Sequence, residues 1–195
     1  LAPAAFHAAS VAAGLRAELG IPADARVGIV AGSLIRRKGH DLLFRAMRTG
    51  AAGAFHLLVV GDGPERESYQ KQSCGLPVHF LGHRDDVGPI MRDAADFLVA
   101  PSRQEAFGRV IIEAALAGIP AIGTRVDGIP EAILEDQTGL LVPPESPEAL
   151  AAAIARLSAD EELRHRMGAA AAQRAHALFT IERVTRMMID EYRGT

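Results

Sequence analysis

Residues 97–118 of the chain read FLVAPSRQEAFGRVIIEAALAG, and this stretch decides the fold. It begins with the apolar run 97–100, which is typical of a buried strand. It ends in the apolar segment 110–118, which predicts a helix that stops at Gly118, shortly before Pro120. The sequence therefore predicts a buried strand that leads through a short turn into a helix.

Two glutamates, Glu105 and Glu113, bracket this strand-to-helix turn. The first turn of a helix has free N–H groups, which bind anions such as phosphate. Carboxylates repel phosphate but accept hydrogen bonds from sugar hydroxyls, so the block suits a nucleotide-sugar. Taken alone, the spacing favours a simpler interpretation, a helix with one exposed Glu near its N-terminus. The rest of the chain reverses that preference.

Composition narrows the class of protein. A chain of 195 residues that is 49% hydrophobic can bury one good core. A formal charge of -3 gives no reason to expect nucleic acid as a partner. The single Cys74 excludes an intramolecular disulfide and a cysteine zinc site, and no histidine pair has metal-binding spacing. We therefore expect no metal site. No apolar run of the chain reaches membrane-spanning length.

Apolar strand patterns alternate with helical patterns along most of the chain. The predicted strands are 27–31, 55–60, 78–81, 97–100, 120–123 and 140–142. The predicted helices are 41–48, one that opens at Pro64, 87–94, 110–118 and 130–134. Continuous apolar strands between helices predict a parallel sheet covered on both faces and joined by right-handed crossovers. We expect an α/β fold, a Rossmann-like doubly wound parallel sheet of about six strands.

Beyond Pro144 the alternation of strand and helix patterns ends. Ser146 is expected to cap a helix whose first residue is Pro147. Helical periodicity then continues to the end of the chain, with breaks near 158–160 and 179–180. The expected organisation is a leading segment with a helix over 1–25, the Rossmann-like domain over 26–157, and extra C-terminal helices over 158–195. The start of the chain has no basic leader and no initiator Met, so we expect a fragment of a longer protein.

Ligands of doubly wound sheets bind outside the carboxyl ends of the strands. Five glycine-containing loops should converge there: 32–39, 61–64, 82–86, 102–108 and 123–128. The first contains Arg36, Arg37 and Lys38, which suit a diphosphate clamp but also an ordinary solvated basic loop. Lys38 is one of only two lysines, which indicates that a compact ammonium is wanted at this position.

Two other motifs are weaker. Residues 61–66, GDGPER, nearly match the dinucleotide fingerprint, but Arg66 stands where the third glycine is needed for close helix packing. Asp85 and Asp86 are adjacent, so a metal-holding Asp-x-Asp motif is not evident. His40 is expected to be an exposed residue at a helix start.

In combination, these motifs resemble the donor-binding half of a retaining GT-B glycosyltransferase. The family in question includes bacterial lipopolysaccharide-core glucosyltransferases, mannosyltransferases and sucrose synthases. The matching segments are Gly32 with 38–43, then 59–64, 80–82, 94–96, 101–102, 105–108 with 113–114, 128–131, 138–143 and 147–150. The resemblance covers nearly all of 26–157 and implies one half of a GT-B fold.

The resemblance implies roles for matching positions. Lys38, with an arginine, would bind the diphosphate and act with Glu105 at the catalytic centre, where Glu105 holds sugar hydroxyls. Glu113 would hold the ribose, and the loop with His83 and Arg84 would line the base. The remaining donor-binding positions are Gly32, Ser33, Gly61, Ala106, Phe107, Gly108, Arg109 and Val110. Many members carry Arg where this chain has Ser33. Arg37 is the candidate for that charge, and which arginine supplies it stays open.

The resemblance also implies the wider function. The expected activity is hexose transfer from a nucleotide-diphosphate sugar, retaining and independent of metals or other cofactors. The acceptor site would lie in an N-terminal domain that is expected to be absent here, so the isolated chain should not complete transfer. Peripheral membrane association would occur through that domain, in the cytoplasm at the inner face of the membrane. The alternatives are a nucleotide-sugar-binding or regulatory module and, less favoured, an NAD-dependent oxidoreductase domain.

Overall fold

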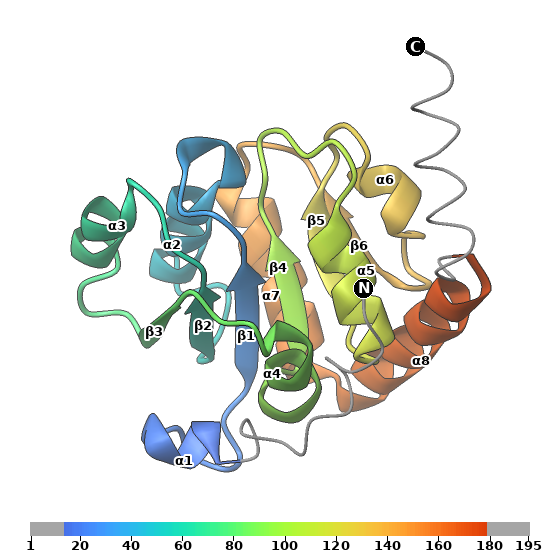
Figure 1. Ribbon diagram of the computed structural model, residues 1–195, viewed down its shortest axis with the longest axis horizontal. Helices are drawn as coiled ribbons and strands as arrows, with labels where there is room; N and C mark the ends of the chain where they lie inside the picture. Colours follow the sequence, from blue (N-terminus) through green and yellow to red (C-terminus); the bar gives the residue numbers. More distant parts are fainter. Residues whose placement is uncertain (1–13, 179–195) are drawn as a thin grey trace.

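The computed structural model describes residues 14–178, which form a six-stranded parallel sheet with helices on both faces (Figure 1). Its strand order is β3-β2-β1-β4-β5-β6, the order of a Rossmann-like doubly wound fold. The strands are β1 Val27–Ala31, β2 His56–Val60, β3 Val78–Gly82, β4 Phe97–Ala100, β5 Ala121–Thr124 and β6 Gly139–Val142. The predicted fold class and the predicted number of strands are therefore confirmed.

The helices cover the two faces because the strands bury side chains on both sides. Along β2, Leu57 and Val59 join the core on one face, and Leu58 and Val60 join the core on the other. Helices α2, α3 and α7 pack on the first face, and α4, α5 and α6 pack on the second. The helices are α1 Leu15–Glu18, α2 His40–Arg48, α3 Arg66–Gln72, α4 Val87–Ala94, α5 Arg109–Leu116, α6 Ile129–Ala132, α7 Pro147–Ala159 and α8 Glu161–Leu178.

Several predicted boundaries recur in the structure, and one helix start is wrong. Ser146 caps α7, since its hydroxyl accepts a hydrogen bond from the Ala149 N–H at 3.3 Å, and the predicted break near 158–160 separates α7 from α8. The predicted break near 179–180 lies outside the described residues. The helix expected to open at Pro64 begins two residues later, at Arg66. Residues 64 and 65 form a turn before the helix. This turn is bound to the loop after β1, because the Glu65 N–H donates to the Leu34 carbonyl at 3.0 Å.

His40 is not the exposed residue that the sequence predicts. It is the first residue of α2, but its side chain is fully buried and stacks on Tyr69 with ring centroids 5.1 Å apart. Neither of its ring nitrogens has a hydrogen-bond partner among the described residues. The start of α2 is covered by α3, which carries Tyr69. Burial lowers the pKa of His40 to about 4.

We expect His40→Phe to remove part of the acid sensitivity of the chain. The pKa of His40 is about 4 in the folded state and 6.5 ordinarily, so the unfolded state takes up the proton first. Stability is therefore lost as the pH falls from 6.5 towards 4, by about 3 kcal/mol in total. Phenylalanine keeps the contact with Tyr69 and cannot be protonated. Urea unfolding at pH 7, 5.5 and 4 should show a smaller loss in the variant, and equal losses would contradict the prediction.

Candidate functional site

A cleft of about 620 Å³ lies at the carboxyl ends of β1 and β2, beside the loop that follows β4. Because β1 and β4 are neighbours in the sheet, this is the point where the strand order reverses and where such folds bind ligands. The volume suits a small-molecule ligand. The predicted site residues that line it are Gly32, Ser33, Arg37, Lys38, Gly61, His83, Arg84, Glu105, Arg109, Val110 and Glu113.

Three predicted residues do not line the cleft. Ala106, Phe107 and Gly108 lie in the turn between Glu105 and the first residue of α5. Gly108 is the N-cap of α5 and has a left-handed backbone with φ of 65°. The Phe107 side chain is 44% exposed. The donor-binding roles predicted for these residues remain a proposal.

The loops that form the cleft touch each other backbone to backbone. Gly61 has φ of 132°, and a Cβ at this position would lie 2.0 Å from the Gly32 carbonyl oxygen. Gly39 has φ of 70°, and a Cβ there would lie 1.9 Å from the carbonyl oxygen of Pro101. Only glycine fits at either position. The loop after β1 is thereby packed against the loop after β2 and against the loop after β4.

Lys38 and Glu105 form an ion pair inside the cleft. Lys38 comes from the short 3-10 turn η2, Arg36–Lys38, and Glu105 comes from the loop after β4. Their side chains are 19% and 14% exposed, so water screens the pair only partly. Lys38 was expected to bind the diphosphate and Glu105 the sugar hydroxyls, and the structure shows that the two residues also contact each other.

Arg103 is a residue that the sequence analysis missed. Its guanidinium donates to both carboxylate oxygens of Asp41, at 2.7 and 2.8 Å, and to the Arg36 carbonyl at 2.8 Å, and it pairs with Glu145. Its backbone N–H donates to the Arg37 carbonyl at 2.7 Å. The hydrogen bonds from the Arg103 guanidinium lower the pKa of Asp41. Arg103 therefore fastens the turn that carries Lys38 to the loop that carries Glu105.

Asp127 is a second residue that the sequence analysis did not single out. Its carboxylate accepts a hydrogen bond from the Glu105 N–H at 2.9 Å. The carbonyl of Glu105 accepts another from the Gly128 N–H at 3.2 Å. Asp127 has φ of 43°, an uncommon backbone for a non-glycine residue that the surrounding contacts must maintain. Its place in the predicted converging loop 123–128 was the available signal.

The N-terminus of α5 separates the two glutamates. The backbone N–H groups of Arg109 and Val110 belong to the first turn of α5, where a helix has no internal partner for its amides, and the Gly108 N–H donates to a Glu105 carboxylate oxygen at 3.4 Å. Glu113 lines the cleft from inside the same helix. Burial raises the pKa of Glu113, and the nearby Arg109 opposes this rise. The arrangement offers hydrogen-bond donors for an anion between two carboxylates.

The far side of the cleft is formed by the loops after β2 and β3. Arg84 donates to both carboxylate oxygens of Asp86, at 2.7 and 2.6 Å, which fixes its guanidinium. Asp62 pairs with Arg66 at 2.8 Å, so the residue that breaks the dinucleotide fingerprint points back to its own loop. The lining residues that the sequence analysis did not name are Ala31, Val60, Asp62 and Val87.

Within 14–178, no three His, Cys, Asp or Glu side chains gather in a way that could hold a metal ion. Within the same residues, no helix has both the length and the apolar character that crossing a membrane requires.

The family of the chain follows from comparison with known proteins. The model of the family described as glycosyl transferases group 1 matches residues 13–174. The chain belongs to the group 1 glycosyltransferases. Among curated members of this kind, the lipopolysaccharide core biosynthesis glycosyltransferase LpsE of Rhizobium meliloti is 34% identical over 165 residues, which cover 83% of this chain and 46% of LpsE.

Solved structures of related glycosyltransferases have the same fold. Sucrose-phosphate synthase of Thermosynechococcus elongatus superposes with a TM-score of 0.80 at 34% identity, over 93% of this chain and 48% of the synthase. HepE of Anabaena, crystallised with UDP and glucose, superposes with a TM-score of 0.82 at 25% identity, over 100% of this chain and 53% of HepE. The chain thus spans about half the length of the relatives it matches, and its likeness to one half of a GT-B fold is confirmed.

Proposed function

We propose that this chain is the donor-binding domain of a retaining, metal-independent glycosyltransferase that moves a hexose from a nucleotide-diphosphate sugar to an acceptor. The observation that carries the proposal is the convergence of Lys38, Glu105, Glu113 and the α5 amides in one cleft at the switch point of the sheet. The relative HepE, which binds UDP and glucose in its structure, supports it.

Each part of the donor finds suitable chemistry in the cleft. Lys38, Arg37 and the amides at the start of α5 supply positive charge and hydrogen-bond donors for the diphosphate. Glu113 would accept hydrogen bonds from the ribose, and Glu105 from the hexose. The base would lie against the loop that carries His83 and Arg84, on the far side of the cleft.

The same groups would promote transfer. When the bond between the sugar and the diphosphate breaks, negative charge develops on the leaving phosphate. Lys38 and the α5 amides are held in position by the packing of the loops, so they can stabilise this charge with little rearrangement. In this proposal they supply the charge that a metal ion would otherwise provide. The acceptor would be held by an N-terminal domain, which would also account for membrane association at the cytoplasmic face.

A second candidate is a nucleotide-sugar-binding or regulatory module without transfer activity. The residues that line the cleft would bind a nucleotide-sugar in either case, so the site fits both candidates. The two candidates differ in what happens when an N-terminal acceptor domain from a relative is joined to this chain. Transfer of a radiolabelled sugar by the joined protein supports the enzyme, and donor binding without transfer supports the module.

We expect the chain to bind a nucleoside diphosphate weakly, with no divalent metal required. Calorimetric titration with UDP, GDP and ADP, each with and without EDTA, measures this directly and also identifies the preferred base. The affinity should be unchanged by EDTA, because the cations of the cleft are side chains. Binding that disappears with EDTA would contradict the metal-independent mechanism, and no binding to any of the three would contradict the proposed function.

A further inference from the structure

The ion pair between Lys38 and Glu105 places a carboxylate on the cation that the diphosphate needs. Both side chains line the cleft, and both are mostly buried. Lysine is the compact point charge that suits a phosphate, and here its charge is balanced within the protein. A phosphate that binds the Lys38 ammonium therefore competes with Glu105.

Glu105 is fixed and cannot simply swing away with its loop. Its N–H is held by Asp127 and its carbonyl by Gly128, at 2.9 and 3.2 Å. Asp127 has a left-handed φ of 43°, which aspartate adopts more readily than most residues, and this backbone presents its carboxylate to the Glu105 N–H. On the other side, Arg103 fastens the turn that carries Lys38. Both members of the pair are thus held where they meet.

We propose that Glu105 determines specificity, as the counter-ion that a phosphate must displace from Lys38, and makes the cleft prefer an intact nucleotide-sugar to the nucleoside diphosphate that transfer leaves behind. This inference rests on the proposed function. The ion pair adds a free-energy cost to ligand binding, and the size of this cost depends on which ligand is bound. Neither residue alone would have this effect.

The penalty follows from the chemistry of a carboxylate. Once Lys38 turns to a phosphate, Glu105 is left partly buried without a cation, which is unfavourable. A bare diphosphate offers it only further negative charge. The hydroxyls of a hexose can donate hydrogen bonds to it and replace the lost partner. The intact donor therefore satisfies both members of the pair, whereas the product satisfies only Lys38. Product release is favoured in consequence.

The test compares Glu105→Gln with the wild-type chain by calorimetry. The probes are UDP and UDP-glucose, GDP and GDP-mannose, and ADP and ADP-glucose. Glutamine has nearly the same size and no charge, so the variant should bind the diphosphate roughly three- to tenfold more tightly. It should bind the intact donor no more tightly, because it loses a charged acceptor for the sugar hydroxyls. The ratio of donor affinity to diphosphate affinity should therefore fall.

Two further variants serve as controls. One distinguishes the charge of Glu105 from its shape, and the other tests whether the loss of a carboxylate elsewhere has the same effect. Glu105→Asp keeps the charge and should keep the weak diphosphate binding of the wild type. Glu67→Gln removes an exposed carboxylate on α3 and should change neither affinity. Thermal unfolding of each variant shows that it is folded before it is titrated.

The results separate this inference from the proposed function. Weaker or unchanged diphosphate binding by folded Glu105→Gln would overturn the inference alone, since it would mean that Glu105 positions Lys38 and does not compete for it. Tighter binding by both Glu105→Gln and Glu105→Asp would overturn it as well, because the cause would then be shape. No binding of any probe by the wild-type chain would overturn the proposed function and the inference together.

Discussion

Lys38→Ala should bind the preferred nucleoside diphosphate roughly ten- to a hundredfold more weakly than the wild-type chain. A hydrogen bond between charged groups contributes about 1.5–3 kcal/mol, which corresponds to this range of affinity. The structure adds a second reason. Lys38 is the partner of Glu105, so its removal leaves a mostly buried carboxylate facing the phosphate. Calorimetry on the two proteins measures the difference.

Two further variants serve as controls for this prediction. Lys71, the only other lysine, lies on the exposed side of α3, and Lys71→Ala should leave the affinity unchanged. The double variant with Lys38→Ala and Glu105→Gln should recover part of the lost affinity, because it removes the unpaired carboxylate too. If Lys38→Ala binds as tightly as the wild type, the diphosphate is not held at this turn.

The sheet could be predicted from the sequence because five of its six strands, all except β3, are mostly buried. Such strands appear as uninterrupted apolar runs, and glycine or proline closes them. Two strands, 27–31 and 97–100, have the same bounds in the structure as in the prediction. The same holds for one helix, 87–94. The place of the cleft could be predicted as well, since the carboxyl ends of parallel strands meet at one edge and the glycine-rich loops follow those ends.

Contacts between side chains of different loops could not be predicted in this way. Lys38 and Glu105 are 67 residues apart, and Arg103 and Asp41 are 62 apart, so no local pattern links them. Each pairing depends on how closely two loops pack. The burial of His40 also depends on where another helix lies, because α3 brings Tyr69 onto its ring. Sequence patterns therefore predict helices and strands more reliably than they predict the contacts between them.

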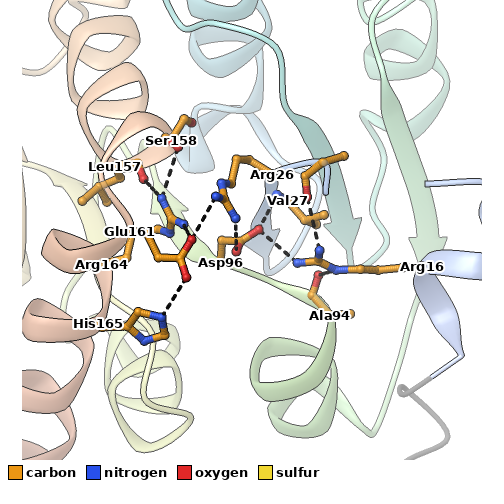
Figure 2. A network of polar contacts seen from close by, with 11 residues as sticks. Arg16, Arg26, Val27, Ala94, Asp96, Leu157, Ser158, Glu161, Arg164 and His165 are labelled. Carbon is orange, nitrogen blue, oxygen red and sulfur yellow. Dashed lines mark hydrogen bonds and ion pairs between the residues drawn. The ribbon is translucent and has the colours of Figure 1, made fainter. Parts of the chain in front are cut away.

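Asp96 shows how a matched segment can have a structural purpose. Residues 94–96 belong to the family resemblance, yet they lie at the end of the sheet opposite the cleft, where β1 and β4 begin. Asp96 pairs with Arg16 at 3.0 Å and with Arg26 at 3.9 Å. Figure 2 shows its carboxylate between the two guanidinium groups. Its carboxylate also accepts the Val27 N–H at 2.7 Å. Arg26 extends the network to Glu161, the first residue of α8. One carboxylate thus joins the segment before β1 to β4 and, through Arg26, to the C-terminal helix.

Asp96→Asn should lower the free energy of unfolding of the chain by about 2–3 kcal/mol. The Asp96 side chain is 16% exposed, so the two arginines lose a counter-ion in a place that water reaches poorly. The size of the residue is unchanged, and the effect therefore reports the charge. For a chain of this length the melting temperature should fall by roughly 4–12 °C.

The matched control is Asp136→Asn, which removes the same charge from an exposed pair with Arg156, where the side chains are 61% and 49% exposed. Asparagine tolerates the left-handed backbone of Asp136, so only the ion pair is lost. An exposed pair contributes about 0–1 kcal/mol, and this variant should melt within a few degrees of the wild type. Because Asp96 lies far from the cleft, folded Asp96→Asn should keep its nucleotide affinity at low temperature. Equal melting temperatures for the two variants would mean that the Asp96 network contributes no more than a surface contact.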